Sequence, residues 1–115
     1  MSIKKFLNSF KYAFSGIKKV AKEEQNFRFH LFATLVVLFS SIFILNFSYI
    51  ELAITIICIS IVLTTEVINT AIENTWNHLE PNHHPVVKSV KDMMAGAVML
   101  SSIGAAIVWI LLILK

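Results

Sequence analysis

The chain alternates between long apolar runs and short polar segments. Residues 29–50 and 93–114 contain no Asp, Glu, Lys or Arg, and each run is 22 residues long. About 20 apolar residues in a helix span the core of a bilayer. A third run, residues 52–65, has 14 uncharged residues before it meets Glu66, and we expect its helix to continue past this carboxylate. The pattern predicts three membrane-spanning helices.

Residues 3–22 have apolar positions three and four residues apart. One face carries Ile3, Phe6, Phe10, Phe14 and Ile17, and the opposite face carries Lys4, Lys11, Lys18 and Lys22. This spacing predicts an amphipathic helix. Its net charge of +6 could attract nucleic acid, but a stripe with three phenylalanines is better suited to the headgroup region of an anionic leaflet. We therefore expect a helix that lies on the membrane and does not bind nucleic acid.

Together these patterns predict an all-α membrane protein with a single domain. The expected elements are a surface helix at about 3–26, spans at about 29–48, 50–79 and 90–114, and a loop at about 80–87. The composition agrees, because 57% of the residues are hydrophobic and only 15% are charged, whereas soluble domains are about one-quarter charged. These numbers exclude a soluble enzyme and a large aqueous domain.

The basic residues predict the orientation of the spans. Seven of the ten Lys and Arg residues precede the first span, and Lys88 and Lys91 lie between the second and third. Cytoplasmic segments carry the excess of basic residues. We therefore expect the N-terminus and the 80–87 loop in the cytoplasm and Lys115 on the far side.

One stripe of the second span is polar. Glu66, Asn69, Glu73 and Asn77 are spaced three, four and four residues apart, so they project from one face of a helix. Counting 1.5 Å per residue from Ile50 places Glu66 roughly 24 Å from the outer end of the helix, at the inner edge of the hydrocarbon, with Glu73 a turn or two beyond. Polar residues can hold spans together, but ionisable groups inside a membrane are usually functional. The stripe therefore indicates an active site.

Other polar clusters are less informative by themselves. Glu24 and Arg28 are four residues apart, the spacing of a salt bridge that closes a helix end. Lys91 and Asp92 are equally well explained as a charged flank of the third span. Two adjacent histidines without further spaced ligands are weak evidence for a metal. The three glycines are isolated, so any nucleotide is held without a P-loop.

These residues resemble one known family over nearly the whole chain. The segments that carry the resemblance are Glu66-Val-Ile-Asn-Thr-Ala-Ile-Glu73, His84-Pro85, Lys91-Asp92 and Ala95-Gly-Ala-Val98, together with residues 10–16 and 24–30. They are similar to the prokaryotic diacylglycerol kinase family, which includes undecaprenol kinases. The resemblance implies a homotrimeric integral protein of a bacterial inner membrane. Such a protein transfers the γ-phosphate of ATP, with Mg²⁺, to a lipid hydroxyl at the cytoplasmic interface.

The resemblance also implies roles for individual residues. Glu66 matches the general base, Asn69 lies beside the reacting groups, and Glu24 and Glu73 match the carboxylates that bind Mg²⁺. The positions that match nucleotide contacts are Lys5, Tyr12, Asn82, His83, His84, Lys91 and Asp92. The positions that match contacts to the lipid are Asn26, Arg28, His30 and Trp109.

Two positions depart from the family pattern. Asn77 stands where an acidic residue is common, which removes a charge unless nearby Glu80 substitutes for it. Lys5 stands where arginine is often found, and lysine lacks the bidentate geometry of a guanidinium. The sequence of residues 24–30 looks more like that of the undecaprenol kinases in the family, so we favour undecaprenol over diacylglycerol as the acceptor.

An alternative from another class is a small oligomeric transporter or channel in which Glu66 binds a cation or a proton. A transport carboxylate would lie nearer the middle of the bilayer, whereas Glu66 and Glu73 lie towards the end that carries Lys91 and Asp92. A non-catalytic membrane subunit is a third possibility, because Asn77 lacks the usual charge.

Overall fold

The chain is entirely helical in a computed structural model that describes residues 2–82 and 84–115. Its elements are α1 (Ile3–Glu23), α2 (Gln25–Phe39), the π-helical turn η1 (Ser40–Ile44), α3 (Tyr49–Leu79) and α4 (Pro85–Leu114). Three helices are long and apolar enough to cross a membrane, namely Gln25–Ile44, α3 and α4. Helix α1 is not one of them. The predicted class, an all-α protein with three spans and a separate N-terminal helix, is confirmed.

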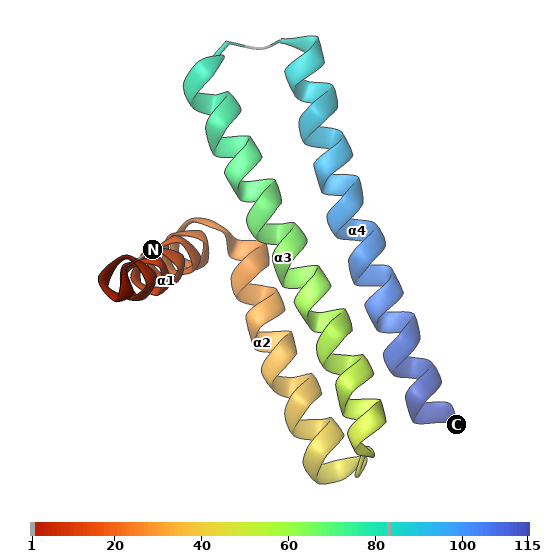
Figure 1. Cartoon of the computed structure of the whole chain (residues 1–115). Helices are drawn as coiled ribbons and strands as arrows, with labels where there is room; N and C mark the ends of the chain where they lie inside the picture. Colours follow the sequence, from red (N-terminus) through yellow and green to blue (C-terminus); the bar gives the residue numbers. More distant parts are fainter. Residues whose placement is uncertain (1, 83) are drawn as a thin grey trace.

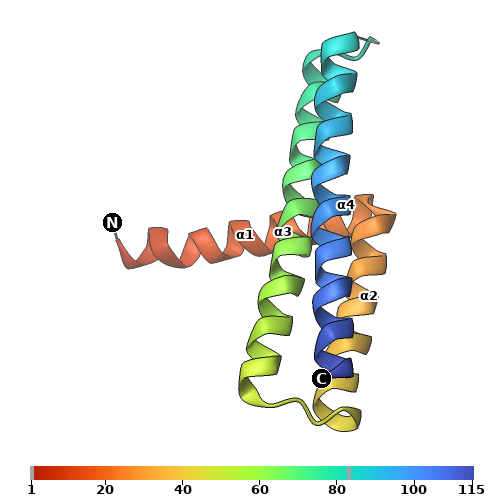
Figure 2. The ribbon, with the colours of Figure 1, turned by 90° about the vertical axis from the view of Figure 1, so that its right-hand side faces the viewer.

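Helices α2, α3 and α4 lie side by side, with α3 in the middle in Figure 1, and α1 runs crosswise away from them (Figure 2). Both α3 and α4 continue past the level of α1 to the loop that joins them. Most large apolar side chains of the three long helices face outward, as expected for helices that contact lipid. Within residues 2–82 and 84–115 the fully buried apolar positions are correspondingly few.

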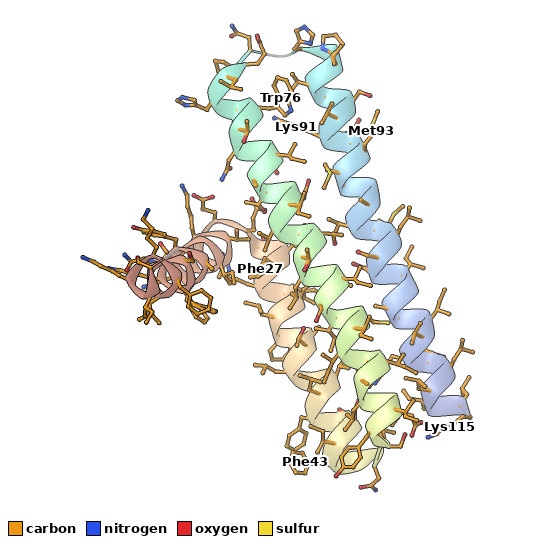
Figure 3. The ribbon with its side chains drawn as sticks, in the orientation of Figure 1. Phe27, Phe43, Trp76, Lys91, Met93 and Lys115 are labelled. Atoms are coloured by element: carbon orange, nitrogen blue, oxygen red, sulfur yellow. The ribbon has the colours of Figure 1, made fainter. Side chains whose placement is uncertain are left out.

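The corner between α1 and α2 is fixed by local contacts. Phe27 is buried there beneath the end of α1 (Figure 3). The Arg28 guanidinium donates hydrogen bonds to the carbonyl oxygens of Ala21 and Lys22, both at 2.9 Å, so it satisfies carbonyls that a helix end leaves free. Asn74 of α3 donates to the Glu23 carboxylate at 3.0 Å. Helix α1 is thereby held against α3.

The ends of the long helices follow from capping residues. Ser48 and Glu51 form a capping box at the start of α3, with bonds of 3.2 and 2.8 Å, which satisfies two backbone N–H groups. Helix α4 begins at Pro85, earlier than the expected residue 90, because proline suits the first helical position. The His84 ring accepts a hydrogen bond from the Val86 N–H at 3.2 Å.

Polar side chains tie the spans together at several levels. Thr65 of α3 and Ser101 of α4 share a hydrogen bond of 3.0 Å. Further along, the Trp109 indole N–H donates to the Ser41 hydroxyl at 3.0 Å. At the far end Lys115 pairs with Glu51, so the last residue of the chain contacts the start of α3.

We expect Trp109→Phe to destabilise the protein by about 1 kcal/mol, the size of one net hydrogen bond in water or in a membrane protein. The substitution leaves the fully buried Ser41 hydroxyl without its donor. Unfolding in detergent micelles would measure the change. Ser41→Ala combined with Trp109→Phe should cost less than the sum of the two single changes, and strict additivity would contradict a direct bond.

Candidate active site

Glu66 is the most deeply buried ionisable group of the polar stripe. It lies on α3 with only 2% of its surface exposed. His30 of α2 places Nε2 3.2 Å from Glu66 Oε1, close enough for an ion pair when the ring is protonated. The contact is not aligned as a hydrogen bond, so Oε1 has no donor within the described residues. A carboxylate oxygen in this position can accept a proton or a hydrogen bond from an incoming group.

Two further carboxylates gather near Glu66. Glu24 occupies the corner between α1 and α2, where burial raises the pKa of its carboxyl above the ordinary value, and the negative charges of Glu73, Glu66 and Glu23 raise it further. The Arg28 guanidinium acts in the opposite direction. The net effect is a raised pKa of the Glu24 carboxyl, with burial as the largest cause.

The carboxylates of this corner suit a divalent cation. Carboxylate oxygens are the ligands that Mg²⁺ prefers, and Mg²⁺ usually takes only one or two of them together with phosphates and water. The residues described contain no group of three or more acidic, His or Cys side chains that could hold a metal by itself. Glu24 and Glu73 could supply the one or two carboxylates of such a metal ion, with phosphate and water as its other ligands.

A polar cavity lies at the α3–α4 end of the molecule. Its volume is about 380 Å³, and its polar lining residues are Asn77, Glu80, Asn82, His84, Lys88 and Lys91. Three of the predicted nucleotide-contacting residues, Asn82, His84 and Lys91, thus share one cavity, and His83 lies outside the described residues. Figure 3 shows Lys91 between α3 and α4 near this loop, beside Trp76.

Asn77 retains part of what an acidic residue would do. Its Oδ1 accepts a hydrogen bond of 2.6 Å from the Lys91 ammonium. A neutral amide accepts this bond without the added strength of an ionised acceptor, and Glu80 lines the same cavity. Asp92 pairs with Lys88 at 2.7 Å, one turn away on α4.

The structure does not bring every predicted site residue together within one chain. Lys5 and Tyr12 are exposed on α1, which runs crosswise at a different level from the α3–α4 loop (Figure 2). The expected ion pair between Glu24 and Arg28 is absent from the residues described, because the guanidinium binds carbonyls of α1. Asn26 is exposed at the corner, and Asn69 is half-buried one turn from Glu66.

An apolar slot of about 200 Å³ opens between α2, α3 and α4. His30 lines one end and Trp109 the other, and Ser102 lines it on α4. Sequence reasoning missed Ser102 and Ser41, although the adjacent serines at 101 and 102 stand out in an otherwise apolar run. The slot connects to the carboxylate site through His30.

These features define an integral membrane protein with a buried carboxylate, an apolar slot and a polar cavity. Comparison with known proteins identifies the family. The sequence model of the prokaryotic diacylglycerol kinase family matches residues 11–113. The chain belongs to this family and is a lipid kinase, an enzyme that phosphorylates membrane lipid alcohols with ATP.

Individual relatives agree with this assignment. The chain is 37% identical to the undecaprenol kinase of Bacillus subtilis, over 97% of this chain and 90% of that protein. It is 34% identical to a diacylglycerol kinase of Synechocystis, over 89% of this chain and 58% of the relative. It is 28% identical to the diacylglycerol kinase of Haemophilus influenzae, over 90% and 86%. Of the functions that the sequence left open, the lipid kinase is confirmed over the transporter.

Proposed function

We propose that the protein transfers the γ-phosphate of Mg·ATP to the hydroxyl of undecaprenol or diacylglycerol, with Glu66 as general base. The observation that carries this proposal is the buried Glu66 carboxylate. Its Oε1 accepts no hydrogen bond from the described residues, and it lies 3.2 Å from His30, which also lines the slot. A lipid hydroxyl reaching Glu66 along the slot remains in an apolar environment until it meets the base.

The transfer is a simple exchange of bonds. The lipid oxygen bonds to the γ-phosphorus, the bond from that phosphorus to the β–γ bridging oxygen breaks, and ADP leaves with the electron pair. The hydroxyl proton passes to Glu66. Phosphoryl transfer depends mainly on positioning and on stabilising charge, and a bound Mg²⁺ supplies charge neutralisation at the phosphate oxygens. Glu24 and Glu73 would hold this ion, and Asn69 would lie beside the reacting groups.

The polar cavity is the proposed site for the nucleotide. Lys91 contributes an ammonium group, and Asn82 and His84 contribute hydrogen-bonding groups. We assign Asp92 and His83 to the same site. Asn26, Arg28 and His30 are placed at the lipid headgroup, and Trp109 beside its chain.

We further propose a homotrimer, with the α1–α2 corner and the α3–α4 loop in the cytoplasm. The three spans carry exposed apolar faces, against which the spans of neighbouring copies can pack. Lys5 and Tyr12 lie on the exposed part of α1, where they could complete the nucleotide site of an adjacent protomer. The basic residues of α1 support the cytoplasmic assignment.

Between the two acceptors we favour undecaprenol. Two observations support this preference: the sequence of residues 24–30 and the 37% identity of the chain to an undecaprenol kinase. Both lipids present a hydroxyl at the same depth, so we expect some transfer to each.

The test is transfer of radiolabelled phosphate from Mg·ATP to undecaprenol and to diacylglycerol in matched mixed micelles. We expect labelled product with both lipids, and a higher kcat/KM for undecaprenol. A preference for diacylglycerol would overturn the assignment of the acceptor. Absence of transfer to either lipid, from folded trimeric protein, would overturn the proposed reaction.

A further inference from the structure

Two buried side-chain oxygens lack a hydrogen-bond partner within residues 2–82 and 84–115, namely Glu66 Oε1 and Ser102 Oγ. Leaving a buried polar atom unpaired costs free energy, so such atoms call for an explanation in the form of a ligand, water or function. The two atoms are complementary, because a carboxylate oxygen accepts and a hydroxyl can donate. Together they match one alcohol group, which both donates and accepts.

The positions of these two residues are set by the contact between α3 and α4. The hydroxyls of Thr65 and Ser101 are 3.0 Å apart, so the two residues lie opposite each other. Glu66 and Ser102 are the next residues on antiparallel helices and are therefore offset by about two helical rises, roughly 3 Å along the axis. Side chains lean towards the N-terminus of their own helix, so along the axis the carboxylate and the hydroxyl lean towards the same level, and the 100° step from the facing pair turns both residues to one side of the α3–α4 contact.

The slot supplies a path to this pair. Ser102 and His30 both line it, and His30 contacts Glu66 Oε1 at 3.2 Å. The other hydroxyls on its wall, those of Thr34 and Thr55, donate to carbonyls of their own helices. The hydroxyl of Ser102 is thus the unpaired one among the described lining residues.

The rest of the slot is apolar and short. On each helix the lining residues fall within an eight-residue segment, 30–37 on α2, 55–62 on α3 and 102–109 on α4, and each segment corresponds to about 10 Å of helix. Trp109 bounds its far end and is held there by Ser41. This shape fits the first part of a hydrocarbon chain that bears a terminal hydroxyl.

We propose that Ser102 is a substrate-binding residue that holds the hydroxyl of the acceptor lipid against Glu66. The lipid hydroxyl donates to Glu66 Oε1 and accepts from Ser102 Oγ, while the first roughly 10 Å of the lipid chain occupies the slot. One lone pair of the lipid oxygen remains free to attack the γ-phosphorus. This inference rests on the proposed lipid kinase reaction and adds a residue to it.

The kinetic test uses Ser102→Ala. We expect kcat/KM to fall about tenfold for both undecaprenol and diacylglycerol, because one buried hydrogen bond is lost. The KM for the lipid should rise while the KM for ATP is unchanged, and Ser102→Thr, which keeps a hydroxyl, should restore most of the loss. Ser101→Ala is the matched control, since its hydroxyl is already paired with Thr65.

The outcomes separate this inference from the reaction itself. Transfer by Ser102→Ala at the wild-type rate would overturn only the role of Ser102. A loss confined to diacylglycerol would place Ser102 on an ester oxygen and would likewise overturn it. Wild-type protein that phosphorylates neither lipid would overturn the proposed reaction and this inference with it.

A binding measurement needs no turnover. In a Trp76→Phe background, Trp109 is the remaining tryptophan. The probe is a long-chain alcohol that carries bromine on a carbon within about 10 Å of its hydroxyl, so that the bromine reaches Trp109 in the slot and quenches its fluorescence. The methyl ether of the same molecule cannot donate to Glu66 and serves as the control. We expect stronger quenching by the alcohol, with the difference lost in Ser102→Ala; equal quenching by both in the Trp76→Phe protein would overturn the proposal.

Discussion

Glu66→Gln is expected to reduce phosphate transfer by about 10²- to 10⁴-fold, the usual contribution of a general base. Glutamine has nearly the same size as glutamate and can still contact His30, but it does not take up the hydroxyl proton at neutral pH. The loss should therefore appear in kcat for both lipid acceptors, with little change in the KM for ATP. Initial rates of radiolabelled phosphate transfer would measure it.

Glu51→Gln is the matched control for this experiment. Glu51 is also a buried carboxylate of α3, but it lies in the first turn of the helix. There it forms the capping box with Ser48 and pairs with Lys115. Its replacement is expected to lower stability while leaving the transfer rate per folded protein unchanged. Retention of more than about one-tenth of the rate in Glu66→Gln would exclude general-base catalysis by this residue.

The second large effect is expected at the metal. Removing Mg²⁺ with a chelator should abolish transfer, and Glu24→Gln or Glu73→Gln should raise the Mg²⁺ concentration needed for half-maximal rate. Loss of an outer-shell partner of a metal ligand costs roughly 10- to 100-fold in affinity, so loss of a direct ligand should cost at least as much. A titration of the transfer rate with Mg²⁺ at fixed ATP would measure the shift.

Glu23→Gln provides the comparison for the metal experiment. Glu23 is next to Glu24 but is engaged by Asn74 and, more loosely, by Lys19. Its replacement should leave the Mg²⁺ requirement nearly unchanged. An equal shift in Glu23→Gln and Glu24→Gln would indicate a general effect of negative charge and would contradict direct binding by Glu24.

Much of the site could be predicted from the sequence because helical spacing reports which residues share a face. Glu66, Asn69, Glu73 and Asn77 were placed on one stripe by their spacing alone. Spacing does not report which neighbour the stripe meets. In the structure Glu66 contacts α2 through His30, whereas Asn77 contacts α4 through Lys91.

At the corner between α1 and α2, sequence spacing again does not predict which group a side chain contacts. The sequence placed Glu24 and Arg28 at the spacing of a helical ion pair. The chain turns at Glu24, so the guanidinium instead reaches the free carbonyls of α1. A local rule for a continuous helix fails where one helix ends and another begins.

The sequence by itself determined the number of spans, the separate surface helix and the polar stripe. These properties depend on the periodicity and length of segments, which a bilayer selects directly. Only the tertiary structure decided that Glu66 and Ser102 each carry an oxygen without a hydrogen-bond partner among the described residues, that Ser102 and His30 line one slot, and that Trp109 is held by Ser41 at its far end. These pairings depend on the register between helices distant in sequence, and that register is set by packing.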